Sequence, residues 1–146
     1  MTQEQKELLL KDLCGRLPYN VKAYVKHWSK LDRKYYEDIY VVKSAFPSLN
    51  QVHVQTERGS VDVLLGYSDY VIKPYLFPLS SMTEEQRKKL FYLSGIDIIY
   101  GKFYTNNEFT LEETLSGINW LLKNHFDIYG LIPMGLANDA TGLNIY

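Results

Sequence analysis

The chain has 146 residues, of which 46% are hydrophobic and 23% are charged. These are ordinary values for a globular protein and exclude a disordered chain. A formal net charge of −1 provides no field that would concentrate nucleic acid or an anionic membrane surface. The length predicts a single domain over residues 1–146, with about ten irregular residues at the end.

The number of cysteines and the type of residues at the N-terminus indicate the cellular compartment of the protein. Cys14 is the only cysteine, so the sequence offers neither a disulfide nor a thiolate metal cluster, which fits a reducing compartment. The first residues are polar and acidic, unlike a secretory signal. No segment approaches the roughly eighteen apolar residues of a membrane span. We therefore expect a cytoplasmic protein that does not contact a membrane.

Three sequences of the capping-box type predict where helices begin. Thr2, Thr83 and Thr110 are each followed three residues later by Gln or Glu, so side chain and backbone can satisfy each other's free donors. Apolar residues at helical spacing follow each of them, and Gly15 would stop the first helix. The predicted helices span about residues 3–14, 84–93 and 110–124.

Between residues 20 and 76 apolar residues alternate with polar ones, which is typical of half-buried strands. The predicted strands span about residues 21–27, 39–45, 51–56, 60–65 and 70–76, with a further short strand within residues 96–104. In the hairpin formed by the third and fourth strands we expect Thr56 to face Val61, with Gly59 at positive φ.

The stretch from Tyr70 to Gln86 combines a strand, a crossing made rigid by Pro74 and Pro78, and a capped helix start. It is predicted to join the sheet to the later helices. The expected fold class is α+β. An N-terminal helix would precede an antiparallel sheet of about five strands, with barrel-like curling left open, and two further helices would pack on that sheet.

Three segments together resemble an uncharacterised family of small proteins encoded in gut bacterial genomes and their phages and prophages. They are KELLLKDLCGRLPY at residues 6–19, IKPYLFPLSSMTEE at residues 72–85 and NHFDIYGLIPMGLA at residues 124–137. The family has no assigned activity, cofactor or catalytic residues. The resemblance thus implies a phage or prophage origin and a shared scaffold, and it transfers no mechanism.

Tyrosine is enriched, with 13 copies that fall mostly in or beside predicted strands. Sheet packing accounts for much of this, and a recognition surface is the alternative, since tyrosine offers a large contact area at low entropy cost. The candidate patch combines aromatic and basic side chains from the first strand and the turn after it. Its members are Lys22, Tyr24, Lys26, Arg33, Tyr35 and Tyr36.

Two pairs of titratable residues are candidates for binding a small ligand. His53 and Asp62 lie on one face of the predicted hairpin, as a base and its orienting carboxylate would. His125 and Asp127 follow the last helix, whose C-terminus favours an imidazolium that Asp127 could hold. The alternative for His125 is a structural role in capping the last carbonyls. No metal site or cofactor is predicted.

The leading hypothesis is a non-enzymatic phage or prophage accessory protein that acts as a binding module. Its partner would be a host or phage protein, or a second copy of the chain. One alternative is a nucleic-acid-binding accessory protein that uses the patch of tyrosine, lysine and arginine side chains to stack on single strands, although the net charge disfavours it. The other is a binder of small ligands such as nucleotides.

Overall fold

The computed structural model describes residues 1–57 and 59–146. The helices are α1 (Gln3–Arg16), α2 (Glu84–Ser94) and α3 (Leu111–Lys123). The strands are β1 (Lys22–Ser29), β2 (Lys34–Phe46), β3 (Gln51–Thr56), β4 (Gly59–Leu64), β5 (Tyr70–Leu76), β6 (Ile96–Ile99), β7 (Lys102–Thr105) and β8 (Asn138–Asp139). The predicted α+β class is confirmed.

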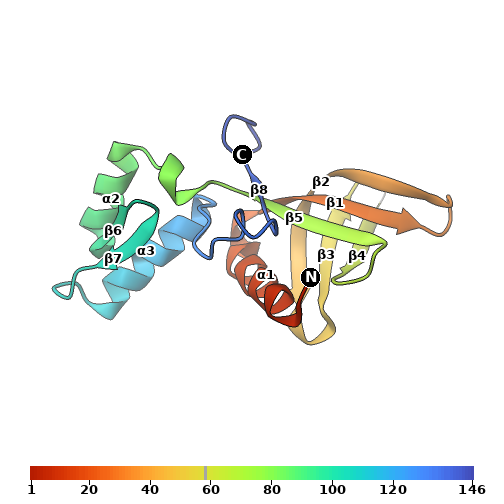
Figure 1. Ribbon diagram of the computed structural model, residues 1–146, viewed down its shortest axis with the longest axis horizontal. Coiled ribbons are helices and arrows are strands. Elements are labelled where there is room, and N and C mark those ends of the chain that lie inside the picture. Colours follow the sequence, from red (N-terminus) through yellow and green to blue (C-terminus); the bar gives the residue numbers. More distant parts are fainter. Residues whose placement is uncertain (58) are drawn as a thin grey trace.

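Six strands form the main sheet, in the order β4-β3-β2-β1-β5-β8. Neighbouring strands run antiparallel except β8, which pairs parallel to β5. The sheet does not close into a barrel, and α1 lies across one of its faces (Figure 1). The predicted sheet of about five strands is therefore correct in type and gains one strand from the C-terminal segment.

The sheet face beneath α1 holds the larger hydrophobic core. Leu9, Leu10 and Leu13 of α1 pack against valines such as Val25 and Val54, which are fully buried. On β1 buried and partly buried residues alternate from Lys22 to Trp28, because successive side chains of a strand point to opposite faces. We call α1, β1–β5 and β8 the sheet lobe.

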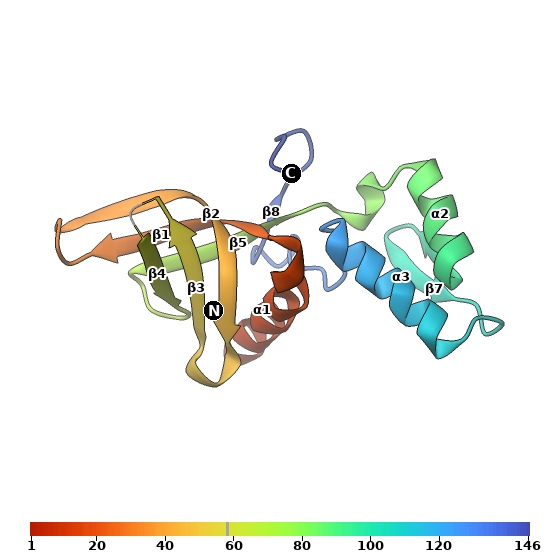
Figure 2. The ribbon, with the colours of Figure 1, turned by 180° about the vertical axis from the view of Figure 1, so that it is seen from behind.

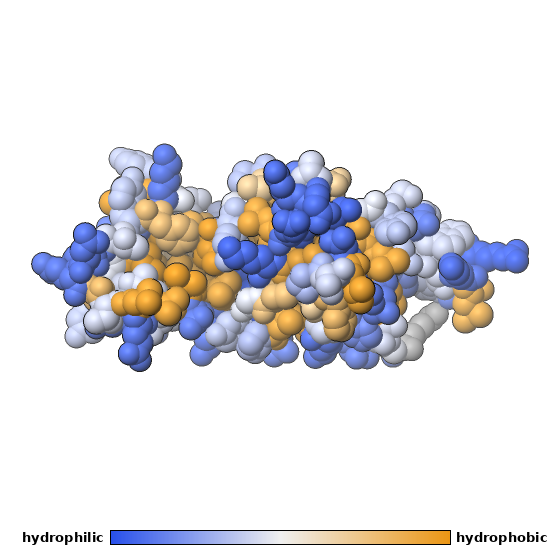
Figure 3. All heavy atoms as spheres, turned by 90° about the horizontal axis from the view of Figure 1, so that it is seen from below, coloured by the Kyte–Doolittle hydropathy of each residue, from blue (hydrophilic) through white to orange (hydrophobic). Residues whose placement is uncertain are grey.

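Helices α2 and α3 pack on each other and on the β6–β7 hairpin (Figure 2). The expectation that they pack on the main sheet is wrong, because their apolar faces form a core of their own. Their own core includes Leu90, Ile96, Ile98 and Leu121. The segment that was expected to be one short strand is thus a separate two-stranded sheet. We call α2, α3, β6 and β7 the helical lobe. Figure 3 shows hydrophobic residues at the surface of the helical lobe and also in the middle of the molecule.

The two lobes meet where β5 leaves the sheet, as the sequence predicted for this stretch. The Phe77 N–H donates to the His125 carbonyl, and the Asp127 N–H donates to the Phe77 carbonyl, each at 2.8 Å. Arg16 of α1 reaches across to the end of α3 and donates to the carbonyls of Leu122 and Phe126. We call this region the junction.

The β3–β4 hairpin differs from the prediction in its register. Thr56 pairs with Gly59 rather than with Val61, and Val54 pairs with Val61. The error is two residues, so every side chain stays on the expected face, because the side-chain period of a strand is two. Gly59 has the predicted positive φ, at 130°. Arg58, in the predicted turn, lies outside the described residues.

Helix α1 does not stop at Gly15 but continues to Arg16. A Cβ atom on Gly15 would lie 3.3 Å from Leu122 Cδ1, so glycine here allows α1 to approach α3 closely. The C-terminal segment forms the short strand β8 and is otherwise irregular. Beyond β8, the Tyr146 hydroxyl donates to the Tyr75 carbonyl at 2.8 Å and accepts from the Lys22 N–H at 3.1 Å.

Candidate functional site

The sheet face opposite α1 carries most of the predicted binding patch. Along β1, Ala23, Val25 and His27 point toward the α1 side and are buried, whereas Lys22, Tyr24 and Lys26 point the other way. The antiparallel pairing then places Ile39 and Lys73 beside Tyr24, Glu37 beside Lys26 and Tyr35 beside Trp28. We call this surface the outer face. It consists of Lys22, Tyr24, Lys26, Trp28, Tyr35, Glu37, Ile39 and Lys73.

The aromatic side chains of the outer face are held by specific contacts. The Tyr24 hydroxyl donates to Glu37 Oε2 at 2.7 Å, and this hydrogen bond raises the pKa of Tyr24. Lys26 Nζ lies 4.9 Å from the centroid of the Tyr35 ring, in a cation–π contact. Trp28 packs edge-on against the same ring, with the centroids 4.9 Å apart. These contacts restrict the rotamers of three large side chains before any partner arrives.

The structure separates two of the six predicted patch residues from the other four. Tyr36 is on the α1 side of β2, where its ring stacks on His27 with centroids 5.7 Å apart. Arg33 occupies the β1–β2 turn at φ 52°. Adjacent residues of a strand face opposite ways, so Tyr35 and Tyr36 could not share a surface once both lay in β2. The prediction grouped them because it began the second strand at residue 39.

Sequence reasoning missed Trp28 and Lys73 as members of the outer face. The alternation that exposes Lys22, Tyr24 and Lys26 continues to Trp28, and that signal was available in the sequence. Lys73 joins the face only because β5 pairs with β1, with Tyr24 directly opposite Lys73. Strand order in an antiparallel sheet is a tertiary property, so this neighbour could not be found from local pattern.

His53 and Asp62 meet on the outer side of the sheet, as the sequence predicted. They are direct cross-strand partners, and His53 Nδ1 lies 2.7 Å from Asp62 Oδ1. This hydrogen bond, with a second from Gln51, lowers the pKa of the Asp62 carboxyl. The side chains are 32% and 55% exposed, so water screens the pair, and its contribution to stability is small.

His125 and Asp127 lie at the junction, and they do not form the predicted pair. Both carboxylate oxygens of Asp127 accept backbone N–H groups instead, from Leu131 at 2.8 Å and Ile132 at 2.9 Å. Burial lowers the pKa of His125 to about 4, and the nearby charges of Arg16 and Lys22 act in the same direction. At neutral pH the side chain is therefore an uncharged imidazole, which corrects the expected imidazolium at the helix end.

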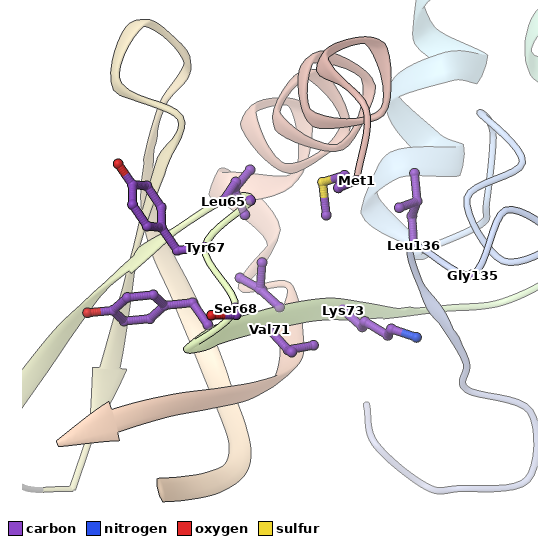
Figure 4. A pocket seen from close by; sticks show the side chains of 11 residues that line it. Met1, Leu65, Tyr67, Ser68, Val71, Lys73, Gly135 and Leu136 are labelled. Carbon is purple, nitrogen blue, oxygen red and sulfur yellow. The ribbon is translucent and has the colours of Figure 1, made fainter. Parts of the chain in front are cut away.

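Three of the hollows in the described surface could admit a small molecule. Figure 4 shows one of about 300 Å³, between the start of α1 and the chain from Leu65 to Lys73. A second, of about 580 Å³, lies beside His27 and Tyr36 at the end of the sheet that α1 leaves uncovered. The third, of about 520 Å³, is at the junction and is lined by His125 and Tyr146.

Among residues 1–57 and 59–146, no group of three or more His, Cys, Asp or Glu side chains is placed to hold a metal ion. Cys14 is partly buried, and burial raises its thiol pKa, which makes a reactive thiolate unfavourable. In the described part of the chain no helix has the length and apolarity needed to cross a membrane. Comparison of the chain with protein-family models, with curated proteins and with solved structures finds no significant match.

Proposed function

We propose that this protein is a non-enzymatic binding module, an accessory protein of the phage or prophage kind, whose outer face binds a partner protein. One observation carries the proposal: a sheet face with no helix over it presents three aromatic rings and three lysines in a fixed arrangement. Tyr and Trp are enriched among the residues that dominate binding energy at protein interfaces. Their preorganisation reduces the entropy lost on binding.

The charges on the outer face define the kind of partner. Lys22, Lys26 and Lys73 lie on the adjacent strands β1 and β5. Two carboxylates lie among the same rings, since Glu37 accepts a hydrogen bond from the Tyr24 hydroxyl and Asp69 accepts one from the Tyr35 hydroxyl. These hydrogen bonds leave both carboxylates charged, so the three lysines give the surface around the aromatic centre only a small positive excess. A complementary partner presents carboxylates around an apolar patch, because matched potentials increase association rates and orient the complex.

The test compares matched variants in quantitative capture from bacterial lysate. Lys26→Glu/Lys73→Glu reverses two charges of the outer face, and Lys89→Glu/Lys102→Glu reverses two exposed charges of the helical lobe. Some lysate proteins should be retained equally by the wild type and by the helical-lobe variant. We expect the outer-face variant to retain at least tenfold less of them. Equal retention by all three proteins, each shown to be folded by its thermal melt, would rule the outer face out as the binding surface.

Single-stranded nucleic acid is the second candidate, because aromatic rings and lysines on an open antiparallel sheet suit base stacking and phosphate contact. Its test is fluorescence anisotropy with a labelled single-stranded oligothymidine at low and moderate salt. Binding that weakens steeply with salt and is lost in Lys26→Glu/Lys73→Glu would favour this function over a protein partner. Absence of binding at low salt would eliminate it.

A further inference from the structure

The cavity at the junction is built from segments that are far apart in the sequence. Phe77 comes from the end of β5, Gln86 from α2, Lys123 and Asn124 from the end of α3, and Tyr146 from the C-terminal segment. Its volume of about 520 Å³ is within the range of small-molecule sites in proteins. The cavity adjoins the outer face at Lys22, whose Nζ lies 6.0 Å from the centroid of the Tyr146 ring, but no residue of the outer face lines it. An inference about the cavity does not depend on the proposed function.

One wall of the cavity is aromatic. The Phe77 ring lies 6.2 Å from that of Phe126 and 6.1 Å from that of Tyr146, measured between centroids. His125 stacks on Tyr146 with centroids 3.7 Å apart and ring planes 10° from parallel. Amide and hydroxyl side chains line the rest, including those of Gln86 and Asn124. A ligand that fits this arrangement has a planar apolar body and a polar end.

The charges around the cavity favour an anionic polar end. None of its described lining residues is acidic, and Lys123 is a lining residue. The cations of Arg16 and Lys22 are close enough to act on His125. The nearest buried carboxylates are already committed, since Asp12 is paired with Arg16 and both oxygens of Asp127 accept backbone N–H groups.

His125 is the feature that the folded chain alone does not explain. It is only 7% exposed, and its Nδ1 atom has no hydrogen-bond partner within the described residues. Leaving such an atom unpaired costs about 1–3 kcal/mol, and most buried polar atoms in proteins have a partner. Its backbone is also left-handed, at φ 59°. Nearby Arg16, by contrast, is fully buried and donates to four acceptor atoms.

We propose that the junction cavity binds a small aromatic anion, a single aryl ring that carries a carboxylate or a phosphate group. The ring packs on the wall formed by Phe77, Phe126 and Tyr146. The anionic group lies at Lys123 and accepts a hydrogen bond from Nε2–H of His125, because the Nδ1 atom is buried beneath the cavity wall. A ring of this size leaves room in the cavity for the water that solvates the remaining polar groups.

The test uses phenyl phosphate and benzoate as probes, in an amide NMR titration of the whole chain. We expect saturable shifts at Phe77 and at residues 123–126, with the stronger probe identifying the anion that the cavity prefers. Benzyl alcohol and benzylamine match the ring and lack the negative charge, and they should bind at least tenfold more weakly. Equal binding of the neutral probe, or no saturable shifts with either anion, would overturn the proposal.

Two variants locate the anion within the cavity. Lys123→Gln removes an exposed charge and should weaken binding of the preferred probe at least fivefold without affecting the fold. His125→Phe keeps a ring to stack on Tyr146 while removing both nitrogens, and it should have a similar effect. Lys102→Gln, on the β6–β7 hairpin, and Lys26→Gln, on the outer face, are the controls. Unchanged affinity in Lys123→Gln would contradict the site, whether or not the His125 variant folds.

Discussion

The sheet lobe and the helical lobe differ in how much core supports them. In the described chain sixteen buried hydrophobic residues form the core between α1 and the sheet, against seven in the core that the helical lobe shares with the junction. Both lobes leave some large side chains in water, such as Leu31 at 92% exposed in the sheet lobe and Tyr92 at 89% in the helical lobe, so the difference lies in the core. A small core supplies little stability by itself. We infer that the helical lobe depends on its contacts with the sheet lobe.

Those contacts are concentrated in a few residues at the junction. The Arg16 guanidinium donates to both carboxylate oxygens of Asp12 at 2.7 Å and to the Phe126 carbonyl at 2.7 Å. Burial raises the pKa of Asp12, and the hydrogen bonds and charge of Arg16 oppose this by lowering it. The ion pair of Asp12 and Arg16 therefore ties α1 to the end of α3, beside the backbone hydrogen bonds of Phe77 at the same place, and the coupling of the two lobes can be weakened there.

The largest expected effect is that of Arg16→Met. It leaves the Asp12 carboxylate buried without its cation and removes the donor of the Phe126 carbonyl, whereas the Leu122 carbonyl still accepts from the His125 N–H. The expected loss is about 3–5 kcal/mol. Urea unfolding measures the loss of stability, and amide exchange should show α2 and α3 opening before the sheet.

The control is Asp12→Leu/Arg16→Met, which removes both charges. Replacement of a complete buried pair by apolar residues is often neutral, so the double variant should recover most of the lost stability. If the double variant is as unstable as Arg16→Met alone, the loss comes from the bonds to the carbonyls of Leu122 and Phe126, and the pair itself contributes little.

The core of the sheet lobe was predicted better than that of the helical lobe. The boundaries of β3 and β5 match their predictions, because apolar–polar alternation is a local signal that survives folding. All three capping boxes form, at Thr2, Thr83 and Thr110. The helical lobe was predicted as helices but not as a separate core, since nothing in α2 or α3 indicates which surface their apolar faces will cover.

The candidate sites also differ in how well the sequence predicted them. The contact of His53 with Asp62 followed from strand pairing, and it survived a register error of two residues because two is the side-chain period. The surroundings of His125 come from α1, β5, α3 and the C-terminal segment, which are brought together only by the tertiary fold. Local reasoning therefore offered Asp127 as a candidate partner and an imidazolium as the charge state, and the structure contradicts both.

Lowering the pH should have an intermediate effect on the free energy of unfolding, through protonation of His125 at the junction. The unfolded chain binds a proton at His125 near pH 6.5, whereas the folded chain does so only near pH 4. Acidification through this window therefore favours unfolding, and stability should fall by about 2 kcal/mol between pH 7 and pH 5 through this residue. Urea midpoints at the two pH values measure the change. In His125→Phe the loss of stability between pH 7 and pH 5 should be smaller by that amount. An identical loss in the wild type and in the variant would show that another group is responsible.

The smallest expected effects come from a matched pair of helix caps, one in each lobe. The Gln5 N–H donates to Thr2 Oγ1 and the Gln86 N–H to Thr83 Oγ1, both at 3.2 Å. Loss of either threonine hydroxyl costs about 1 kcal/mol. Because the two variants lose about the same free energy, they differ only in which amides become less protected. That difference shows how far the helical lobe depends on the sheet lobe.

If the helical lobe opens by itself while the sheet lobe stays folded, Thr83→Ala should speed amide exchange in α2 and α3 about fivefold, the factor that corresponds to about 1 kcal/mol, with no change in the sheet. Thr2→Ala should instead lower the urea midpoint of the whole chain, because α1 covers the core of the sheet lobe. Equal effects of both variants on every amide would mean that the lobes unfold as one unit, and that the junction couples them more strongly than the small core of the helical lobe implies.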